Sequence, residues 1–193
     1  MKFSPEIKLP TKFGDLKVIV GPEKDGFPLW VVFYRRPWEE IPFLRIHSSC
    51  LFSESFFSTD CDCSMQLERA LSLVNANGGA IVYLYQEGRG QGLFRKALAI
   101  HEEQSRGVDT AEAFQRLGYD LDPRDYSGVA DALKCIDFPS VVNLATSNPR
   151  KIASLEAAGY RVATRVHLRV DLTPIIEQYL GSKVRGLGHY EQD

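Results

Sequence analysis

Three cysteines close together in the chain place the strongest constraint on its fold. Cys50, Cys61 and Cys63 follow the pattern Cys-x10-Cys-x-Cys. Thiolates at this spacing can converge on one zinc ion, and three protein ligands leave the fourth tetrahedral position open, as in catalytic zinc sites. A structural zinc site needs a fourth ligand, for which His47 and Cys135 are the candidates. Cys135 lies in a predicted amphipathic helix, where a core role is the simpler expectation, and buried, inert thiols are the remaining alternative for the whole set.

Composition limits the class of protein. The chain has 193 residues, 44% of them hydrophobic and 25% charged, which fits one globular domain over residues 1–193. It shows no secretory segment and no apolar run long enough to cross a membrane, so a cytoplasmic protein without disulfides is expected. The net charge of −2 gives no broad basic surface for nucleic acid. It leaves room for a local basic pocket that binds a small phosphorylated ligand.

The first 50 residues are predicted to form short strands. Runs of β-forming residues cover 16–20, 29–34 and 43–48, with a turn at GPEKDG (21–26) and a break at Pro37. Nothing between these runs resembles a crossover helix. We therefore expect an antiparallel meander.

After Cys63 the pattern changes to alternating helices and strands. Leu67, Ala70, Leu71 and Val74 repeat at the spacing of one helix face, and Asn77-Gly78-Gly79 ends that helix. This alternation predicts an α/β fold with a mixed sheet flanked by helices. The further strands are expected at 81–85, 141–145 and 160–166, and the further helices at 93–105, after Asp109, at 127–136, after Asn148 and at 175–180, before a polar tail.

Two strand-to-helix turns are candidates for phosphate binding. In the glycine-rich loop 86–92 (QEGRGQG), backbone N–H groups can approach an anion and Arg89 can add a bidentate contact. In the turn 146–151 (TSNPRK), Thr146 and Lys151 are placed to hold phosphate, and Asn148 can cap the helix that begins at Pro149. Ordinary turn and capping roles are the alternative at both places. The first loop is not a P-loop, because no Gly-Lys-Ser/Thr follows it.

Other polar residues carry weaker signals. Residues 122–126 (DPRDY) form a charged turn that, by its pattern alone, is expected to be a solvated helix cap. His47 is a candidate zinc ligand, a partner of a ligand or a donor in the pocket. His101, His167 and His189 have no local signal and are expected to lie on the surface or to have ordinary hydrogen-bond partners.

Taken together, these segments resemble GTP cyclohydrolase II, the enzyme that opens riboflavin biosynthesis. Several motifs in the right order are far more specific than any one of them, and here they cover nearly the whole chain. They are LPTKFGD at 9–15, RIHS at 45–48, the three cysteines, Gln66, QEGRG at 86–90, Asp109-Thr110, Leu117-Gly118, DxRD at 122–125 and TxNPxK at 146–151.

The resemblance implies a reaction and a set of roles. Such enzymes open the imidazole ring of GTP at C8, release formate and remove pyrophosphate, which leaves 2,5-diamino-6-ribosylamino-4-pyrimidinone 5′-phosphate. The three cysteines match the ligands of a zinc ion that activates water, Mg²⁺ would bridge the triphosphate, and a homodimer is implied. Asp122 matches the position of a proton acceptor. Arg124 matches that of a nucleophile toward the α-phosphorus, for which a clamp on the α-phosphate is the conservative alternative. The implied GTP-binding residues are Arg45, His47, Ser48, Gln66, Glu87, Gly88, Arg89, Thr110, Thr146 and Lys151.

Three positions depart from the family pattern. Ile100 stands where a tyrosine is usual, Ser49 where a glutamate precedes the first cysteine, and Gln91 where an apolar residue or an Asn-Ile pair is common. All three are expected near the zinc end of the site, and Ile100 is also expected to pack in the core with Leu93 and Ala97. The departures motivate a second hypothesis, a paralogue that stops at the formamidopyrimidine ribotide or acts on a related purine nucleotide. A third is a catalytically weak nucleotide-binding protein with a structural zinc.

Overall fold

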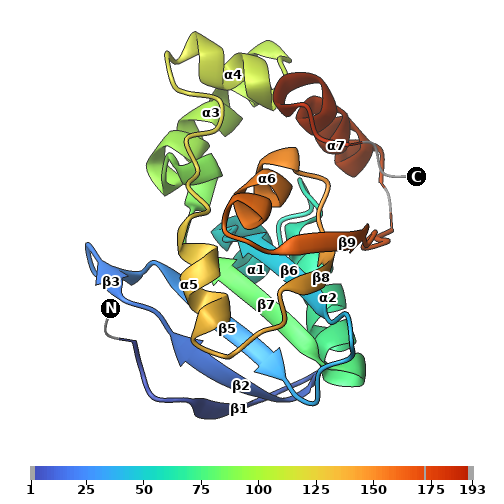
Figure 1. Cartoon of the computed structure of the whole chain (residues 1–193). Helices are drawn as coiled ribbons and strands as arrows, with labels where there is room; N and C mark the ends of the chain where they lie inside the picture. Colours follow the sequence, from blue (N-terminus) through green and yellow to red (C-terminus); the bar gives the residue numbers. More distant parts are fainter. Residues whose placement is uncertain (1–2, 172, 191–193) are drawn as a thin grey trace.

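The computed structural model describes residues 3–171 and 173–190, and within them a mixed sheet of seven strands forms the centre of the molecule (Figure 1). The strand order is β1-β2-β5-β7-β6-β8-β9. The half from β1 to β7 is antiparallel, and the half from β7 to β9 is parallel. The predicted α/β fold is therefore confirmed. The strands are β1 (Ile7–Thr11), β2 (Gly14–Val20), β5 (Trp30–Arg35), β6 (Phe43–Ser48), β7 (Gly79–Leu84), β8 (Val141–Ala145) and β9 (Arg161–Arg165), and a small hairpin, β3 (Glu23–Lys24) with β4 (Phe27–Pro28), occupies the predicted turn.

The predicted antiparallel meander is correct for β2 and β5 but wrong for β6, and the sequence did not predict β1, which extends the antiparallel part. β6 lies between β7 and β8 and runs parallel to both. The chain passes from β6 to β7 through α1 (Leu51–Phe56), which the sequence did not predict, and α2 (Cys63–Asn77). A parallel pair needs such a crossover. A short apolar run has the same pattern in a parallel and an antiparallel strand, so 43–48 alone did not disclose its partner.

Helices cover both faces of the sheet. On one face Val32 belongs to the same buried cluster as Leu133 of α5 (Gly128–Lys134). On the other face Ile81 clusters with Val74 of α2. These apolar layers are the main hydrophobic stabilisation of the fold, because burial of apolar surface dominates folding free energy. In the described part of the chain, no helix has both the length and the apolar character needed to cross a membrane.

A second group of helices lies at one end of the sheet (Figure 1). It consists of α3 (Leu93–Arg106), α4 (Thr110–Arg116) and α7 (Pro174–Leu187), and α4 contacts both of the others. α7 is longer than the predicted 175–180; the Thr173 side chain accepts a hydrogen bond from the Ile176 N–H at its start. The predicted cap of α6 (Pro149–Ala157) is confirmed, since the Asn148 side chain accepts from the Arg150 N–H.

Candidate active site

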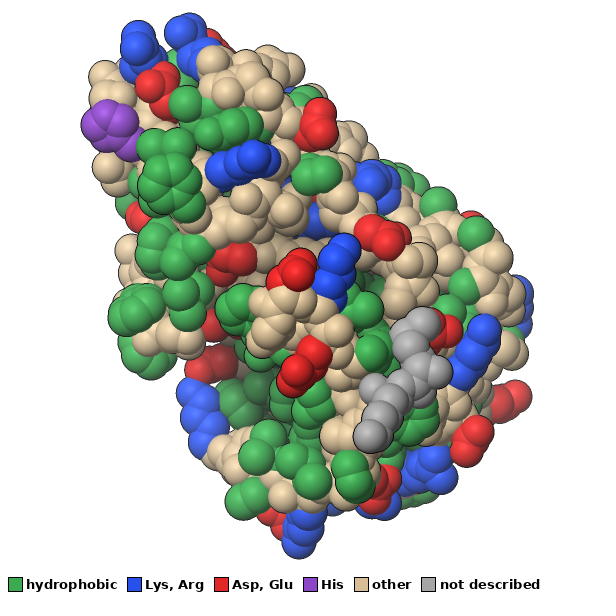
Figure 2. Space-filling model, turned by 90° about the vertical axis from the view of Figure 1, so that its left-hand side faces the viewer, with side chains coloured by type: hydrophobic (Ala, Val, Ile, Leu, Met, Phe, Trp, Pro, Cys, Tyr) green, Lys and Arg blue, Asp and Glu red, His purple; other side chains and the backbone are tan. Residues whose placement is uncertain are grey.

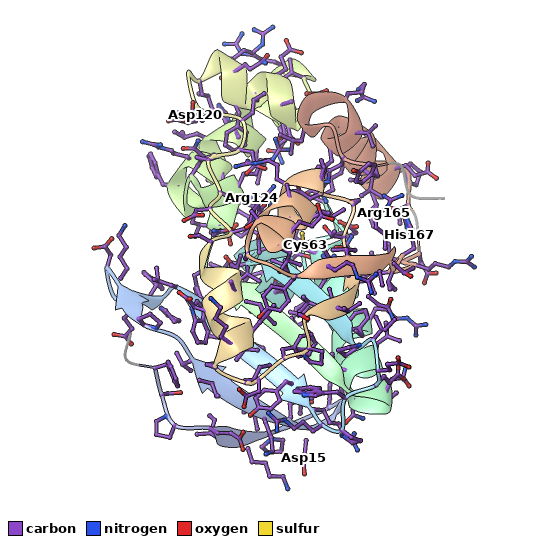
Figure 3. The ribbon with its side chains drawn as sticks, viewed as in Figure 1. Asp15, Cys63, Asp120, Arg124, Arg165 and His167 are labelled. Carbon is purple, nitrogen blue, oxygen red and sulfur yellow. The ribbon has the colours of Figure 1, made fainter. Side chains whose placement is uncertain are left out.

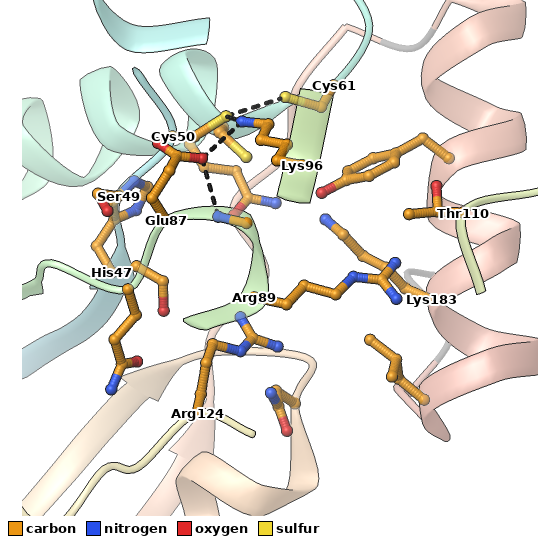
Figure 4. A pocket seen from close by; sticks show the side chains of 18 of the residues that line it. His47, Ser49, Cys50, Cys61, Glu87, Arg89, Lys96, Thr110, Arg124 and Lys183 are labelled. Carbon is orange, nitrogen blue, oxygen red and sulfur yellow. Dashed lines mark hydrogen bonds and ion pairs between the residues drawn. The ribbon is translucent and has the colours of Figure 1, made fainter. Parts of the chain in front are cut away.

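One cavity lies where three parallel strands end beneath α3, α4 and α7 (Figure 4). β6 leads into residues 48–50, β7 into the loop 86–89 and β8 into the turn 146–151, and all three segments line the cavity. Figure 3 shows Cys63 and Arg124 in this region between the sheet and the upper helices. In open α/β sheets, ligands bind outside the carboxyl ends of the strands. The topology therefore places the candidate site where such a fold is expected to have one.

The three cysteines converge at one side of this cavity. The sulfur atoms of Cys50, Cys61 and Cys63 all lie within 4.8 Å of one another, with 3.7 Å between Cys50 Sγ and Cys61 Sγ. Tetrahedral zinc with Zn–S bonds of about 2.3 Å holds its sulfurs about 3.8 Å apart, so this donor set fits a zinc ion. Within 3–171 and 173–190, no fourth candidate ligand joins the group. Cys135 packs against the main core instead, and His47 Nε2 lies 2.9 Å from Glu54 Oε1.

Lys96 of α3 lies beside the sulfur of Cys50, and the sequence patterns did not single it out as a site residue. Its Nζ lies 3.1 Å from Cys50 Sγ and 2.8 Å from Glu87 Oε1 (Figure 4). Burial lowers the pKa of Lys96, but the Cys50 sulfur and the Glu87 carboxylate outweigh burial and raise it overall. Hydrogen bonds from Cys50 and Cys63 lower the pKa of Cys61 to about 3, whereas those from Cys50 and Cys61 raise that of Cys63. The hydrogen bonds among the three sulfurs therefore favour the thiolate form of Cys61 over that of Cys63, and Lys96 Nζ lies beside them.

The cavity is basic although the chain has a net charge of −2. Lys151 Nζ is buried and donates to the Ile46 carbonyl at 2.9 Å. Burial, together with the neighbouring Arg45 and Arg124, lowers the pKa of Lys151 well below its usual range. Like charges gathered in one cavity favour an anionic ligand. The cations that line it are Arg45, Arg89, Lys96, Arg124, Lys151 and Lys183, and the acids are Asp60, Glu87 and Glu103.

Buried polar atoms without partners also gather here. Both terminal nitrogens of Arg89 are buried and have no hydrogen-bond partner among the described residues, and the same holds for Ser48 Oγ and His47 Nδ1. Apart from Trp30 Nε1, every atom of this kind found in the described chain belongs to a residue that lines the cavity. Leaving such a group unpaired costs about 1–3 kcal/mol. The cavity is therefore built for a ligand with several hydrogen-bonding groups.

The glycine-rich loop needs its glycines to bring the backbone close to two of these cations. The loop forms a 3-10 turn over Glu87–Gly90, in which Gly88 has φ 58° and Gly90 has φ 84°. A Cβ at Gly88 would lie 3.0 Å from Lys96 Cβ, and one at Gly90 would lie 3.3 Å from Arg124 Cγ. Arg89 adopts φ 60°, a left-handed conformation that is unusual outside glycine. Backbone strain of this kind concentrates at functional sites.

The charged turn 122–126 is not the solvated cap that its pattern suggested. The side chains of Asp122 and Arg124 are only 7% and 11% exposed and form a two-point ion pair. Arg150 Nη1 lies 3.1 Å from the same carboxylate. Although burial raises the pKa of Asp122, its bonds to Arg124 and the charge of Arg150 lower it overall. Arg124 lines the cavity, and Asp122 lies behind it.

All ten residues predicted to bind the nucleotide line this one cavity, together with the three cysteines and Arg124. A chain of hydrogen bonds holds some of them in place: Arg45 donates to Gln66, and Gln66 donates to Asp62, which lies between two of the cysteines. Arg45 also donates to the Ala145 carbonyl at 2.8 Å. The sequence motifs thus predicted which segments meet, although the roles of the individual residues stay predictions.

The three departures from the family pattern do not all lie in the cavity. Ser49 and Ile100 line it, whereas the Gln91 side chain donates to the Asp120 carbonyl at 2.9 Å and is not part of the lining. The predicted core role of Ile100 is wrong, since Leu93 is 37% exposed and the buried residue of α3 is Ala99. The face of α3 that packs against the rest of the protein is therefore not the face that its apolar sequence pattern indicated.

Four lining residues come from the C-terminal segment, which the sequence analysis had treated as a short helix and a polar tail. They are Tyr179, Lys183, Leu187 and His189. His189 is therefore not an ordinary surface histidine. No local motif could have found these residues, because only the packing of α7 brings them to the cavity.

Comparison with known proteins gives the same assignment as the motifs. The family model described as GTP cyclohydrolase II matches residues 2–167. The chain is 38% identical to the GTP cyclohydrolase-2 of Campylobacter hominis over 193 residues, which cover 100% of this chain and 97% of that protein. It is 41% identical to the GTP cyclohydrolase-2 of Azotobacter vinelandii over 190 residues, covering 94% and 88%. It is also 39% identical to the riboflavin biosynthesis protein RibBA of Thermotoga maritima, covering 98% of this chain and 48% of that protein. The chain belongs to the GTP cyclohydrolase II family.

Proposed function

We propose that the protein is a zinc- and Mg²⁺-dependent GTP cyclohydrolase II, which opens the imidazole ring of GTP at C8 and releases formate and pyrophosphate. One observation carries the proposal: the three-sulfur group faces a basic cavity whose buried polar atoms lack partners. The sulfurs suit zinc, and the cations suit a triphosphate. Family membership supplies the substrate and the reaction type.

Cys50, Cys61 and Cys63 would hold the zinc ion. Zinc bound there would act as a Lewis acid, which lowers the pKa of a bound water to roughly 7. Lys96 offsets part of the negative charge of the sulfurs, since its Nζ lies 3.1 Å from Cys50 Sγ. Glu87 accepts a hydrogen bond from Lys96, which orients its carboxylate toward the cysteine group. The Glu87–Lys96 pair is thus well placed to hold or move a proton beside the reacting purine.

The triphosphate would occupy the basic side of the cavity with Mg²⁺ bridging its oxygens. Arg89 offers two guanidinium nitrogens that have no hydrogen-bond partner among the described residues, and Lys151 offers a buried amine. Asp122 orients Arg124 and favours its charged form; burial lowers the pKa of Arg124, but the Asp122 carboxylate raises it overall. A charged guanidinium has no free lone pair. These contacts support Arg124 as a clamp on the α-phosphate and weigh against its acting as a nucleophile.

The reaction products test the proposal. The zinc-loaded protein is incubated with GTP and Mg²⁺, the nucleotide product is weighed by mass spectrometry, and formate and pyrophosphate are assayed. Equal amounts of formate and pyrophosphate are expected. GTP binding without turnover would overturn the proposal and favour a nucleotide-binding protein.

A second candidate follows from two residues of the cavity lining that depart from the family pattern. Ile100 and Ser49 both line the cavity, and an isoleucine can neither donate a hydrogen bond nor relay a proton. This favours the paralogue whose product keeps its formyl group. Pyrophosphate without stoichiometric formate, together with a product heavier by one formyl group, would identify it.

We also propose that the chain forms a homodimer. Figure 2 shows hydrophobic side chains gathered on the face that carries α3. Phe94 at the start of α3 and Phe57 after α1 are each 77% exposed, and Phe56 is 69% exposed. Large exposed apolar side chains are typical of an interaction surface. A second copy of the chain is the partner that the family resemblance implies.

A further inference from the structure

The C-terminal helix turns one face toward the cavity. Tyr179, Lys183 and Leu187 are spaced four residues apart, which places them in one row along α7, and all three line the cavity. His189 follows just after the helix and lines the same space. These residues lie beyond residue 167, where the match to the family model ends.

Contacts with three other walls fix the position of this segment. Lys183 Nζ lies 3.3 Å from Oδ1 of the fully buried Asp62, between the second and third cysteines. Gly186 packs so closely on α4 that an added Cβ would lie 2.6 Å from Ala111 Cβ. His189 Nδ1 lies 3.2 Å from the Ser147 hydroxyl in the turn 146–151. α7 therefore joins the cysteine turn, α4 and the phosphate-binding turn.

Two polar groups of the segment are suited to an anion. The Lys183 side chain is 17% exposed, its ion pair with Asp62 is long at 3.3 Å, and its Nζ lies 4.0 Å from the centre of the Tyr179 ring. Figure 4 shows Lys183 and Arg89 pointing into the same part of the cavity, with Arg124 nearby. His189 Nε2 is buried and has no hydrogen-bond partner among the described residues. In the tautomer in which Nδ1 accepts from the Ser147 hydroxyl, Nε2 carries the proton and can donate.

We propose that the C-terminal segment is part of the substrate site and that Lys183 is a substrate-contact residue that binds the phosphate chain of the nucleotide, with His189 Nε2 donating to the same chain. This inference rests on the proposed function and deepens it. Lys183 adds a cation from a helix that no nucleotide-binding motif of the sequence includes. A phosphate oxygen accepts strong hydrogen bonds from an ammonium and from an imidazole N–H. A bound phosphate chain would therefore supply a hydrogen-bond acceptor to both Lys183 Nζ and His189 Nε2.

The test compares Lys183→Met with Lys183→Arg and with Lys134→Met, which removes an exposed lysine of α5 that is not part of the cavity lining. The zinc-loaded full chain is assayed for the KM of GTP and for inhibition by two probes, inorganic tripolyphosphate and guanosine. We expect Lys183→Met to raise the KM and to weaken tripolyphosphate inhibition by about tenfold or more, because a charge-assisted contact is lost. Guanosine has no phosphate, so its inhibition should stay within about twofold. Lys183→Arg should keep most of the tripolyphosphate affinity, and Lys134→Met should match the wild type.

Two outcomes would overturn the inference while leaving the proposed function standing. One is unchanged tripolyphosphate inhibition in Lys183→Met. The other is an equal loss of inhibition by both probes, accompanied by loss of zinc. That result would mean that Lys183 acts only by holding the cysteine turn through Asp62. The zinc content and the thermal unfolding of each variant report this directly. If the wild-type protein neither turns over GTP nor binds tripolyphosphate, the proposed function is overturned as well.

Discussion

Arg124 donates two hydrogen bonds to Asp122, from Nε at 2.7 Å and from Nη2 at 2.8 Å. The pair is nearly buried, and Arg150 approaches the same carboxylate. A two-point contact fixes the plane of the guanidinium, which a single contact from a lysine cannot do. The direction in which Arg124 faces the cavity is therefore fixed by Asp122, two residues earlier in the same turn.

Arg124→Lys should slow pyrophosphate release. The substitution keeps the charge but loses the planar fork, and loss of one preorganised contact to a reacting group costs about 10²–10³ in kcat. Pyrophosphate production is the measurement, with zinc content expected to be unchanged. Arg116→Lys is the matched control, because Arg116 also donates two bonds to one carboxylate, that of Glu112, on the exposed face of α4. Equal rates for Arg124→Lys and the wild type would contradict the assigned role.

Lys151 should make the stability of the nucleotide-free protein depend on pH. Its folded-state pKa is well below the unfolded value of about 10.4, because burial and neighbouring cations disfavour the ammonium. Between the lowered pKa and about 10.4 the unfolded chain binds the additional proton, so the free energy of unfolding rises with pH through this window.

Lys151→Met removes this proton difference. At pH 7 it should raise the free energy of unfolding, flatten its rise toward pH 9 and weaken GTP binding. Urea unfolding at several pH values measures the first two effects. The exposed substitution Lys134→Met should leave the slope as in the wild type. A slope in Lys151→Met as steep as in the wild type would show that another group causes it.

The cysteine group should bind about one zinc ion per chain. Cys61→Ser is expected to lose zinc and activity together, since serine is a much poorer zinc ligand than a thiolate. Cys135→Ala, outside the group, should keep both. Metal analysis of the purified variants gives the stoichiometry. Full zinc content in Cys61→Ser would point to a different set of ligands.

Phe94→Asp should weaken the proposed homodimer. A charge in an apolar interface loses its hydration without gaining a partner, which costs more than lost packing alone. Light scattering after gel filtration should show the variant as a monomer at concentrations where the wild type is a dimer. Phe27→Asp is the matched control, because Phe27 is 62% exposed on the separate β3–β4 hairpin. A wild type that is monomeric would reject the dimer itself.

Local patterns predicted most elements of the fold. The strand at Val141–Ala145 and the Asn148-Pro149 start of α6 agree with the structure, because strand propensity and helix capping depend on neighbouring residues. The same holds for the convergence of the three cysteines, whose spacing restricts where their sulfurs can meet. The motifs RIHS, QEGRG and TxNPxK reach one cavity because each stands at the end of a strand in the parallel half of the sheet, whereas Gln66 and Thr110 are brought there by α2 and α4.

The sequence by itself determined most of the helices and strands, but not α1 or β1, and it determined the residue types at the ends of the strands. The tertiary structure alone decided that β6 lies between β7 and β8, that Ile100 faces the cavity and that α7 closes one side of it. It also decided which cations approach the sulfur group: Lys96 lies 46 residues from Cys50 along the chain, and Lys183 lies 121 residues from Asp62. The physical reason is that propensity and capping act over a few residues, whereas these contacts depend on strand order and helix packing, which no short pattern specifies.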